Sequence, residues 1–217
     1  MQYLKIVYLI FLENIFNNGI FDSQVKAFLL ALKRRYGARL NLLLIANMPI
    51  VNITRRAIVF NFIQHKMNRN YLTKEFTAGG VGFTLLPIYF PFLQRWGFYL
   101  NIALLPIIFV VSFPLLFLAV KRFKPDIMHC RSYPATLIAI VLKYLLPFDT
   151  KVVFDMRGLY PEEGIVHKRW KERSLSYKIW KKIEHVLLRL SDKIIVVSDS
   201  FKDHIETLVG NYATMIK

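Results

Sequence analysis

The chain has 217 residues, of which 55% are hydrophobic and 20% are charged. This composition excludes a disordered or collagen-like chain and favours a folded protein with one sizeable core. With 30 Lys or Arg against 14 Asp or Glu, the net charge is +16, so a polyanion or an anionic membrane is the natural partner.

Short apolar runs alternate with longer periodic ones along the chain, the pattern of βαβ units on a parallel sheet. Strands are expected at residues 5–11, 39–46, 83–89, 126–130, 151–155 and 193–197. Helices are expected at residues 24–36, 98–122, 134–145, 175–190 and 199–208. The predicted fold class is therefore α/β, with a Rossmann-like parallel sheet and helices on both of its faces.

The turn after the first strand carries Asn17, Asn18 and Gly19, ahead of a helix with Ser23 near its start. Asn and Gly tolerate left-handed backbone angles, and the free N–H groups of a helix N-terminus suit a phosphate. Because any tight turn favours the same residues, a phosphate site and an ordinary turn both remain open here. A glycine-rich segment at 79–82 precedes a strand instead of following one, so it predicts a loop or β-bulge and not a dinucleotide fingerprint.

A stretch of 25 residues, 96–120, carries no charge and is followed by Lys121, Arg122 and Lys124. Its length is sufficient to span a bilayer, but Pro106 and Pro114 weaken a spanning helix. The strands before and after it are expected in one sheet, and hence on one side of any membrane. We therefore expect a crossover helix, partly buried in the core and partly dipped into the lipid interface; a re-entrant hairpin and a true span are the alternatives.

Basic residues concentrate in two segments. Between Ser23 and Lys74 there are ten Lys or Arg and no Asp or Glu, and from Lys168 to Lys182 seven basic residues accompany Glu172 alone. Each segment is either a solvated helix face or a surface for an anionic partner. Within the helix expected at 175–190, an apolar stripe at helical spacing predicts packing against the sheet. The stripe consists of Ile179, Ile183, Val186, Leu187 and Leu190.

Polar side chains gather where two neighbouring strands end, which is where open parallel sheets bind their ligands. Arg131 follows the fourth strand, and Asp155 and Arg157 follow the fifth. Arginines suit bidentate contacts with phosphate or carboxylate, and Asp155 is placed to orient or deprotonate a hydroxyl; the alternative is an internal Asp–Arg ion pair. Cys130 is the one cysteine, and no second Cys or His stands at ligand spacing from His129, so neither a disulfide nor a metal site is predicted.

Three runs of residues, 124–134, 154–163 and 194–198, resemble the N-terminal domain of retaining GT-B glycosyltransferases of family 4. The step Ser23-Gln24-Val25 is similar to one branch of that family. In this family two Rossmann-like domains face each other, the N-terminal one holding the acceptor and the C-terminal one the nucleotide sugar. The resemblance thus implies a nucleotide-sugar co-substrate, no further cofactor and no metal.

The resemblance also implies roles for individual residues. Asn18 and Gly19 are expected to approach the donor diphosphate, and Asp155 and Arg157 to be catalytic. The expected acceptor-binding residues are Arg131, Ser132, Tyr133, Gly158, Glu162 and Glu163. Many members carry a histidine where this chain has Asp155, so Asp155 is not assigned as a nucleophile. Retention is usually attributed to a front-face reaction assisted by the leaving phosphate.

The whole chain, 1–217, is expected to form one such N-terminal domain, because it stops about where the family's interdomain linker begins. We expect it to be inactive alone and to work with a donor-binding half, on the same or a separate chain. The expected acceptor is a lipid-linked or polysaccharide glycan at the inner face of the cytoplasmic membrane, which explains the basicity. The alternative is a non-catalytic membrane-anchoring subunit that recruits a donor-binding chain. Nucleic-acid binding is disfavoured, because the aromatics lie in apolar runs.

Overall fold

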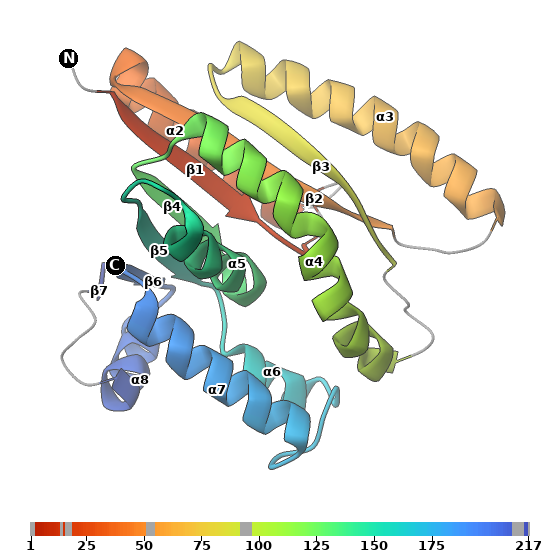
Figure 1. Cartoon of the computed structure of the whole chain (residues 1–217), viewed down its shortest axis with the longest axis vertical. Helices are drawn as coiled ribbons and strands as arrows, with labels where there is room; N and C mark the ends of the chain where they lie inside the picture. Colours follow the sequence, from red (N-terminus) through yellow and green to blue (C-terminus); the bar gives the residue numbers. More distant parts are fainter. Residues whose placement is uncertain are drawn as a thin grey trace. The chain divides into compact units, whose positions relative to one another are not determined.

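The computed structural model describes residues 3–13, 15, 19–50, 55–91, 97–209 and 215–216. Its contacts divide the chain into two compact units, Met1–Asp126 and Ile127–Lys217. We call them unit 1 and unit 2 and describe each by itself (Figure 1).

Unit 1 holds three parallel strands in the order β3-β2-β1. The strands are β1 (Leu4–Ile10), β2 (Leu40–Ile50) and β3 (Gly82–Pro91). A continuous helical stretch after β1 comprises α1 (Gly19–Phe21), the π-helical turn η1 (Asp22–Lys26) and α2 (Ala27–Tyr36), and the 3₁₀ turn η2 (Gly37–Arg39) leads into β2. The other helices are α3 (Arg55–Ala78), between β2 and β3, and α4 (Gly97–Phe123), after β3.

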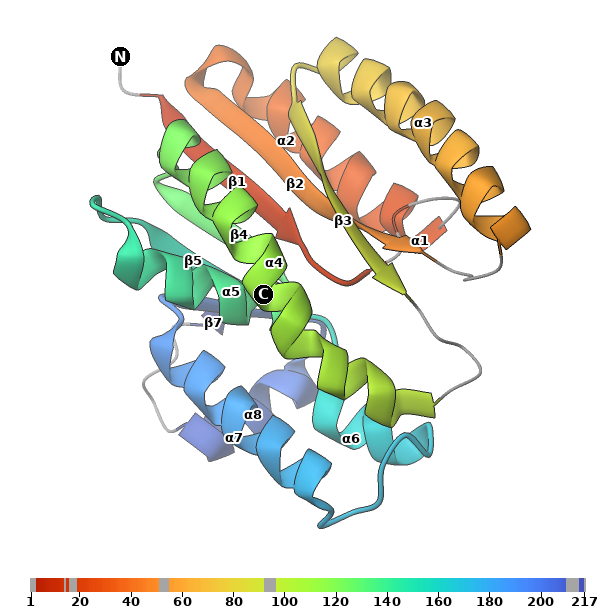
Figure 2. The ribbon, with the colours of Figure 1, turned by 45° about the vertical axis from the view of Figure 1, so that its right-hand side comes forward.

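The two faces of this sheet are covered by different helices, as Figures 1 and 2 show. The alternate residues Leu40, Leu42 and Leu44 of β2 pack in one cluster with Leu29 of α2 and Phe76 of α3. Because side chains of a strand alternate between faces, α2 and α3 share that face. On the other face α4 runs across the strands, which gives helices on both sides of the sheet.

Unit 2 repeats the alternation with four parallel strands in the order β4-β5-β6-β7. The strands are β4 (Ile127–Arg131), β5 (Lys151–Met156), β6 (Lys193–Val196) and β7 (Met215–Ile216). The helices are α5 (Ser132–Leu145), α6 (Tyr160–Val166), α7 (Leu175–Leu190) and α8 (Asp199–Val209). All six predicted strands and all five predicted helices are confirmed, as is the Rossmann-like α/β class.

Two helices and one short strand were not predicted. In α3 the described side chains include only two buried apolar residues, Leu72 and Phe76. The apolar pattern that would predict a helix is therefore weak, and charged residues interrupt it. The helix α6 has seven residues and begins with Tyr160 and Pro161, a pattern that also reads as a loop. The strand β7 has two residues, too few for a periodic signal.

The charge-free stretch lies largely in α4, one helix that continues through Pro106 and Pro114, so its described part is not a hairpin. Ser112, Leu116 and Val120 are fully buried. An exposed apolar row runs beside them, which we call the α4 row: Ile107, Val110, Val111, Leu115 and Leu118. Over the part of the chain that the structure describes, we find no helix with the length and apolarity that crossing a bilayer requires.

The glycine-rich segment after α3 is a helix cap, which confirms the predicted loop. The N–H of Val81 donates to the carbonyl of Phe76 (2.8 Å) and the N–H of Gly80 to that of Thr77 (3.0 Å), the bonding pattern of a Schellman motif. Gly80 has φ +71°, the left-handed conformation that this motif requires.

Replacing Gly80 by alanine is therefore expected to lower the free energy of unfolding by about 1–2 kcal/mol, because a residue with a Cβ is strained in the left-handed backbone conformation. Urea unfolding measures it. Gly19→Ala is the matched control, because an added Cβ there meets nothing within 4 Å and Gly19 is not among the positive-φ residues. An equal effect of both substitutions would contradict the assignment of the cap.

The predicted packing of α7 is wrong for most of its stripe. Of the five stripe residues only Leu187 is buried, while Ile179, Val186 and Leu190 are exposed. The buried face of α7 instead contains Trp180, Glu184, Leu187 and Leu188. Burial of the Glu184 carboxylate is possible because it accepts a hydrogen bond from a tyrosine on α5. This contact is long-range, so the spacing of residues along α7 does not predict it.

Candidate functional site

The carboxyl ends of β4 and β5 bring four charged or ionisable side chains together in unit 2. Arg131 and Asp155 are register partners on the two strands. The carboxylate of Asp155 lies 3.5 Å from Nε2 of His129 and 3.4 Å from Nη1 of Arg157. Asp155 is only 4% exposed, whereas the side chain of Arg157 is 29% exposed. The site therefore has a buried carboxylate at its centre and an accessible guanidinium at its surface.

The charge of Asp155 is set by two opposing effects. Burial raises its pKa, but the hydrogen bond with His129 and the electrostatic interactions with His129, Arg157 and Arg131 lower it more, so the pKa of Asp155 lies below its ordinary value. Asp155 is thus ionised at neutral pH and a weak base. It is better suited to hold two arginines in place than to abstract a proton.

The turn from β4 to α5 is strained at Ser132, which has φ +69° without being glycine. The hydroxyl of Thr136 donates to the carbonyl of Ser132 over 2.8 Å and so helps to hold this turn. Strain of this kind, at about 1–3 kcal/mol, often occurs at functional sites, where neighbouring structure enforces it. Here it lies directly after Arg131 at the strand end.

Tyr133 lies behind the site and not on its surface. It is 1% exposed, and its ring packs edge-on against Phe154 and Trp180. Its hydroxyl donates to Oε2 of Glu184 over 2.5 Å, and burial followed by the charge of Glu184 raises the pKa of Tyr133. As placed, Tyr133 can influence an acceptor only by fixing the turn above it.

Glu162 belongs to the same network, at its partly exposed end, since its side chain is 33% exposed and that of Lys181 is 27% exposed. Lys181 donates to Oε1 of Glu162 (2.9 Å) and to Oε1 of Glu184 (2.5 Å), while the hydroxyl of Tyr177 donates to Glu162 (3.3 Å). Glu162 Oε2 is buried and has no hydrogen-bond partner among the described residues. The network therefore ties α6 to α7, and through Tyr133 to α5.

Gly158 and Glu163 lie side by side at the site. A Cβ added to Gly158 would collide with the carboxylate of Glu163, which is exposed. The next residue after Glu163, Gly164, packs against the indole of Trp170, and Trp170 Nε1 donates to the carbonyl of Pro161 over 2.8 Å. The indole thereby fixes the segment that carries Glu162 and Glu163.

The remaining expected residues belong to unit 1. Gly19 is exposed and is the first residue of α1, whereas Asn18 lies outside the described residues. Ser23 does not cap this helix from the front, because it lies within the helical stretch and its hydroxyl donates back to the carbonyl of Gly19 over 2.7 Å. The prediction for Asn18 and Gly19 stays a prediction.

Sequence reasoning missed the indole support and the network that joins Tyr133, Glu162, Lys181 and Glu184. Glu184 is a lone acid in a strongly basic helix, and this was the available signal. Lys181 was assigned only to the basic cluster, and Trp170 was given no role. Their partners lie between 3 and 51 positions away in the sequence.

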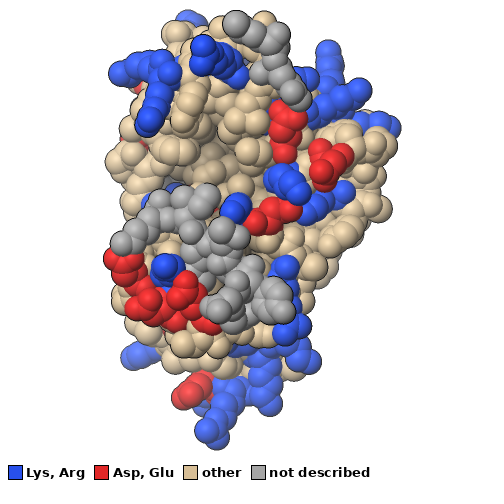
Figure 3. Space-filling model, turned by 90° about the vertical axis from the view of Figure 1, so that its left-hand side faces the viewer, with Lys and Arg blue, Asp and Glu red and all other residues tan. Residues whose placement is uncertain are grey.

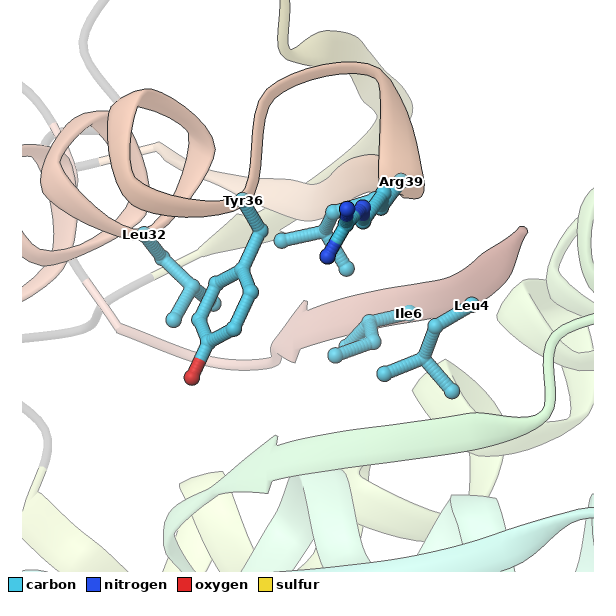
Figure 4. A pocket seen from close by; sticks show the side chains of 6 residues that line it. Leu4, Ile6, Leu32, Tyr36 and Arg39 are labelled. Carbon is cyan, nitrogen blue, oxygen red and sulfur yellow. The ribbon is translucent and has the colours of Figure 1, made fainter. Parts of the chain in front are cut away.

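A separate pocket of about 390 Å³ lies in unit 1 at the amino ends of β1 and β2, the edge opposite to the carboxyl ends (Figure 4). It is mostly apolar and contains none of the expected site residues. Its walls are Leu4, Ile6, Leu32, Tyr36, Arg39 and Leu40.

No group of three or more His, Cys, Asp or Glu side chains is arranged to hold a metal ion among the residues described. Cys130 is buried, and this burial raises the pKa of its thiol, which keeps it protonated.

Acid stability depends on a second carboxylate, that of the partly buried Asp192. Asp192 accepts from Lys143 Nζ over 2.7 Å and from the N–H of Val152 over 2.8 Å. Burial raises its pKa, but these hydrogen bonds and the charges of Lys143 and Lys151 lower it below the ordinary value. The stability that Asp192 contributes is therefore fully present above the unfolded-state pKa of about 4 and is lost as the pH falls through the lower folded value.

Asp192→Asn is accordingly expected to be less stable than the wild type at pH 5–7, with a difference that shrinks as the pH falls below about 4. Urea unfolding at several pH values measures this difference. Glu206→Gln, at an exposed i,i+4 pair with Lys202, is the control and should change little. A difference that grows on acidification would contradict the assignment.

Comparisons with known proteins agree with this arrangement. The model of the family described as Glycosyltransferase Family 4 matches residues 87–215. Glycogen synthase from Fusobacterium nucleatum is 30% identical over 100 residues, which are 45% of this chain and 22% of that protein. The chain thus spans under a quarter of the length of this curated relative.

Solved structures share the fold. A sucrose-phosphate synthase from Thermosynechococcus elongatus has a TM-score of 0.60 at 10% identity, over 98% of this chain and 47% of that one. A glycosyltransferase from Rickettsia africae has a TM-score of 0.56 at 12% identity, over 100% of this chain and 42% of that one. These similarities show a GT-B type N-terminal fold. Since the family match covers more than half of the residues, the chain belongs to Glycosyltransferase Family 4.

Proposed function

We propose that the chain is the acceptor-side half of a retaining glycosyltransferase, which moves a sugar from a nucleotide sugar to a membrane-associated acceptor. The acceptor is a lipid-linked glycan or a growing polysaccharide. The reaction takes place at the inner face of the cytoplasmic membrane.

The observation that carries the proposal is the charge arrangement at the carboxyl ends of β4 and β5. Arg131 and Arg157 both lie near the carboxylate of Asp155, and their positive charges lower its pKa. Guanidinium groups bind phosphate and carboxylate oxygens in pairs, with short charge-assisted hydrogen bonds. An acceptor with a phosphate or diphosphate link to lipid supplies such oxygens.

Each residue has a distinct part in this proposal. Arg157 contacts the acceptor because its side chain is accessible, and Asp155 positions it. Ser132, Gly158 and Glu163 line the acceptor side. Arg131 and Tyr133 support the site from within and Glu162 supports it through α7, while Asn18 and Gly19 serve the donor diphosphate.

The membrane part of the proposal is supported by the α4 row. Its five apolar side chains are exposed on one side of the helix, and Lys121, Arg122 and Lys124 follow at the C-terminal end. Apolar area beside basic residues is typical of helices that lie in the interface of an anionic leaflet.

The donor half is proposed to lie outside the 217 residues, in the same polypeptide or in a separate chain. This is supported by the two solved glycosyltransferase-type structures, of which the chain covers less than half. The purified 217-residue chain alone is expected to turn over no nucleotide sugar. Turnover by the isolated chain would refute this part of the proposal.

Transfer itself is tested in membranes of the source organism from which the coding gene has been deleted. The membranes are incubated with radiolabelled UDP-glucose, UDP-N-acetylglucosamine or GDP-mannose, and label is counted in extracted lipid and in polymer. Re-expression of the wild-type chain together with its donor-binding half is expected to restore labelling from one donor. Equal restoration by Arg157→Ala and Asp155→Asn would contradict a catalytic role and favour the membrane-anchoring subunit.

A further inference from the structure

The helix α7 presents apolar side chains to solvent along its whole length. Leu175 is 74% exposed, Ile179, Val186 and Leu190 are also exposed, and Ile183 is partly buried. At 3.6 residues per turn these five positions fall within an arc of roughly 80°. We call them the α7 row. The opposite face, with Trp180 and Leu188, is buried in unit 2, so α7 has one apolar face inside and another outside.

Basic side chains follow one edge of the α7 row. Lys178, Lys182 and Arg189 are exposed and lie on the next arc of the helix. The loop between α6 and α7 adds four more basic residues against a single acid, Glu172. These are Lys168, Arg169, Lys171 and Arg173. Figure 3 shows Lys and Arg side chains gathered at the lower end of the face that it presents.

The loop before α7 is held in a defined conformation. Trp170 is buried and bonded to Pro161, and the hydroxyl of Ser174 accepts from the N–H of Tyr177 at the start of α7 (3.3 Å). Lys168 and Arg173 both have left-handed backbone angles, φ +54° and +62°. Because the surface is preorganised, binding to it costs little ordering entropy.

From these observations we infer that the α7 row and the basic α6–α7 loop form a docking surface for an anionic lipid bilayer. Charge complementarity selects the occupant: an anionic leaflet offers acidic headgroups to the basic edge and acyl chains to the apolar row. A nucleic acid would pair only with the basic side chains and would leave the apolar α7 row exposed to water. The inference deepens the membrane part of the proposed function and rests on it for its purpose, but it concerns a different helix from the α4 row.

The test is co-sedimentation of the purified chain with vesicles of phosphatidylcholine, with and without 40 mol% phosphatidylglycerol. We expect binding to the anionic vesicles, weakening with salt, and little binding to pure phosphatidylcholine. In the double variant Ile179→Ser, Val186→Ser the partition coefficient is expected to fall about tenfold or more. In Lys178→Glu, Lys182→Glu a comparable fall is expected.

A matched control is available on α5. Val141→Ser with Leu145→Ser removes two apolar side chains outside both rows, 43% and 56% exposed against 45% and 46% for Ile179 and Val186, and should leave vesicle binding unchanged. All substituted side chains are exposed, and far-ultraviolet circular dichroism checks that each variant is folded. Wild-type partitioning of both α7 variants would overturn the inference, as would equal binding to neutral vesicles. A concentration-dependent dimer that the α7 variants abolish would also overturn it, because the row would then bind a second copy.

Vesicle binding uses no nucleotide sugar, so the two proposals fail separately. A chain that binds anionic vesicles through α7 but restores no sugar transfer refutes the proposed function and leaves the docking surface standing. A chain that restores transfer while its α7 variants bind vesicles normally refutes the docking surface alone.

Discussion

Lys181→Met is expected to lower the free energy of unfolding by about 3 kcal/mol, the lower end of the range for breaking a buried ion pair. The lower end applies because the Lys181 side chain is 27% exposed. Its loss leaves Glu184, a fully buried carboxylate, with the Tyr133 hydroxyl as its remaining described hydrogen-bond partner. An uncompensated buried charge is costly, and chemical denaturation at pH 7 measures the loss.

A double variant separates charge from shape. In Lys181→Met, Glu184→Gln the buried charge is gone, and the amide still accepts a hydrogen bond from Tyr133. Most of the lost stability is expected to return, a non-additivity typical of coupled partners. Tyr133→Phe alone is expected to cost only about 1 kcal/mol, the net value of one hydrogen bond.

Arg157→Ala is expected to lower sugar transfer roughly 10- to 100-fold at limiting acceptor, which corresponds to hydrogen bonds from a charged donor of about 1.5–3 kcal/mol. The reason is that Arg157 is the accessible guanidinium at the site, whereas Arg131 is buried. The measurement is the initial rate of label incorporation in the deletion-strain membranes at several acceptor concentrations. The effect is expected mainly in KM for the acceptor.

Two further variants make this result specific. Arg157→Lys keeps the charge but not the planar fork, and is expected to recover only part of the rate. Arg34→Ala removes an exposed arginine from the C-terminal turn of α2 and should leave transfer unchanged. Equal KM values for wild type and Arg157→Ala would remove Arg157 from the acceptor site.

Much of the fold was accessible from the sequence because its strands are short apolar runs bounded by turn residues. The segment 151–155 is an example. Its apolar run ends in the charged residue Asp155, and the segment forms β5. The same reasoning placed Asp155 beside Arg131, because parallel strands end at one edge. The ion pair between Asp155 and Arg157 was also anticipated, as the alternative to a catalytic carboxylate.

What could not be predicted depended on contacts between distant residues. The stripe of α7 satisfies the helical period, but the period does not say which of two apolar faces is buried. That choice depends on Trp180, which packs on Tyr133, and on the hydrogen bond between Tyr133 and Glu184, 51 positions apart. Tyr133 was expected to bind the acceptor because it follows the strand end, but its side chain turns inward and is buried.

The central claim is that the carboxyl edge of β4 and β5 binds the anionic part of an acceptor. Titration of the ¹⁵N-labelled chain with farnesyl phosphate, a short soluble polyprenyl phosphate, tests it most directly. The account predicts saturable shifts of the backbone amides of residues 131–133 and 155–158 and of the Arg157 side chain, and weaker backbone shifts in Arg157→Ala. Saturable shifts confined to unit 1, or identical shifts in the Arg157→Ala variant, would contradict it.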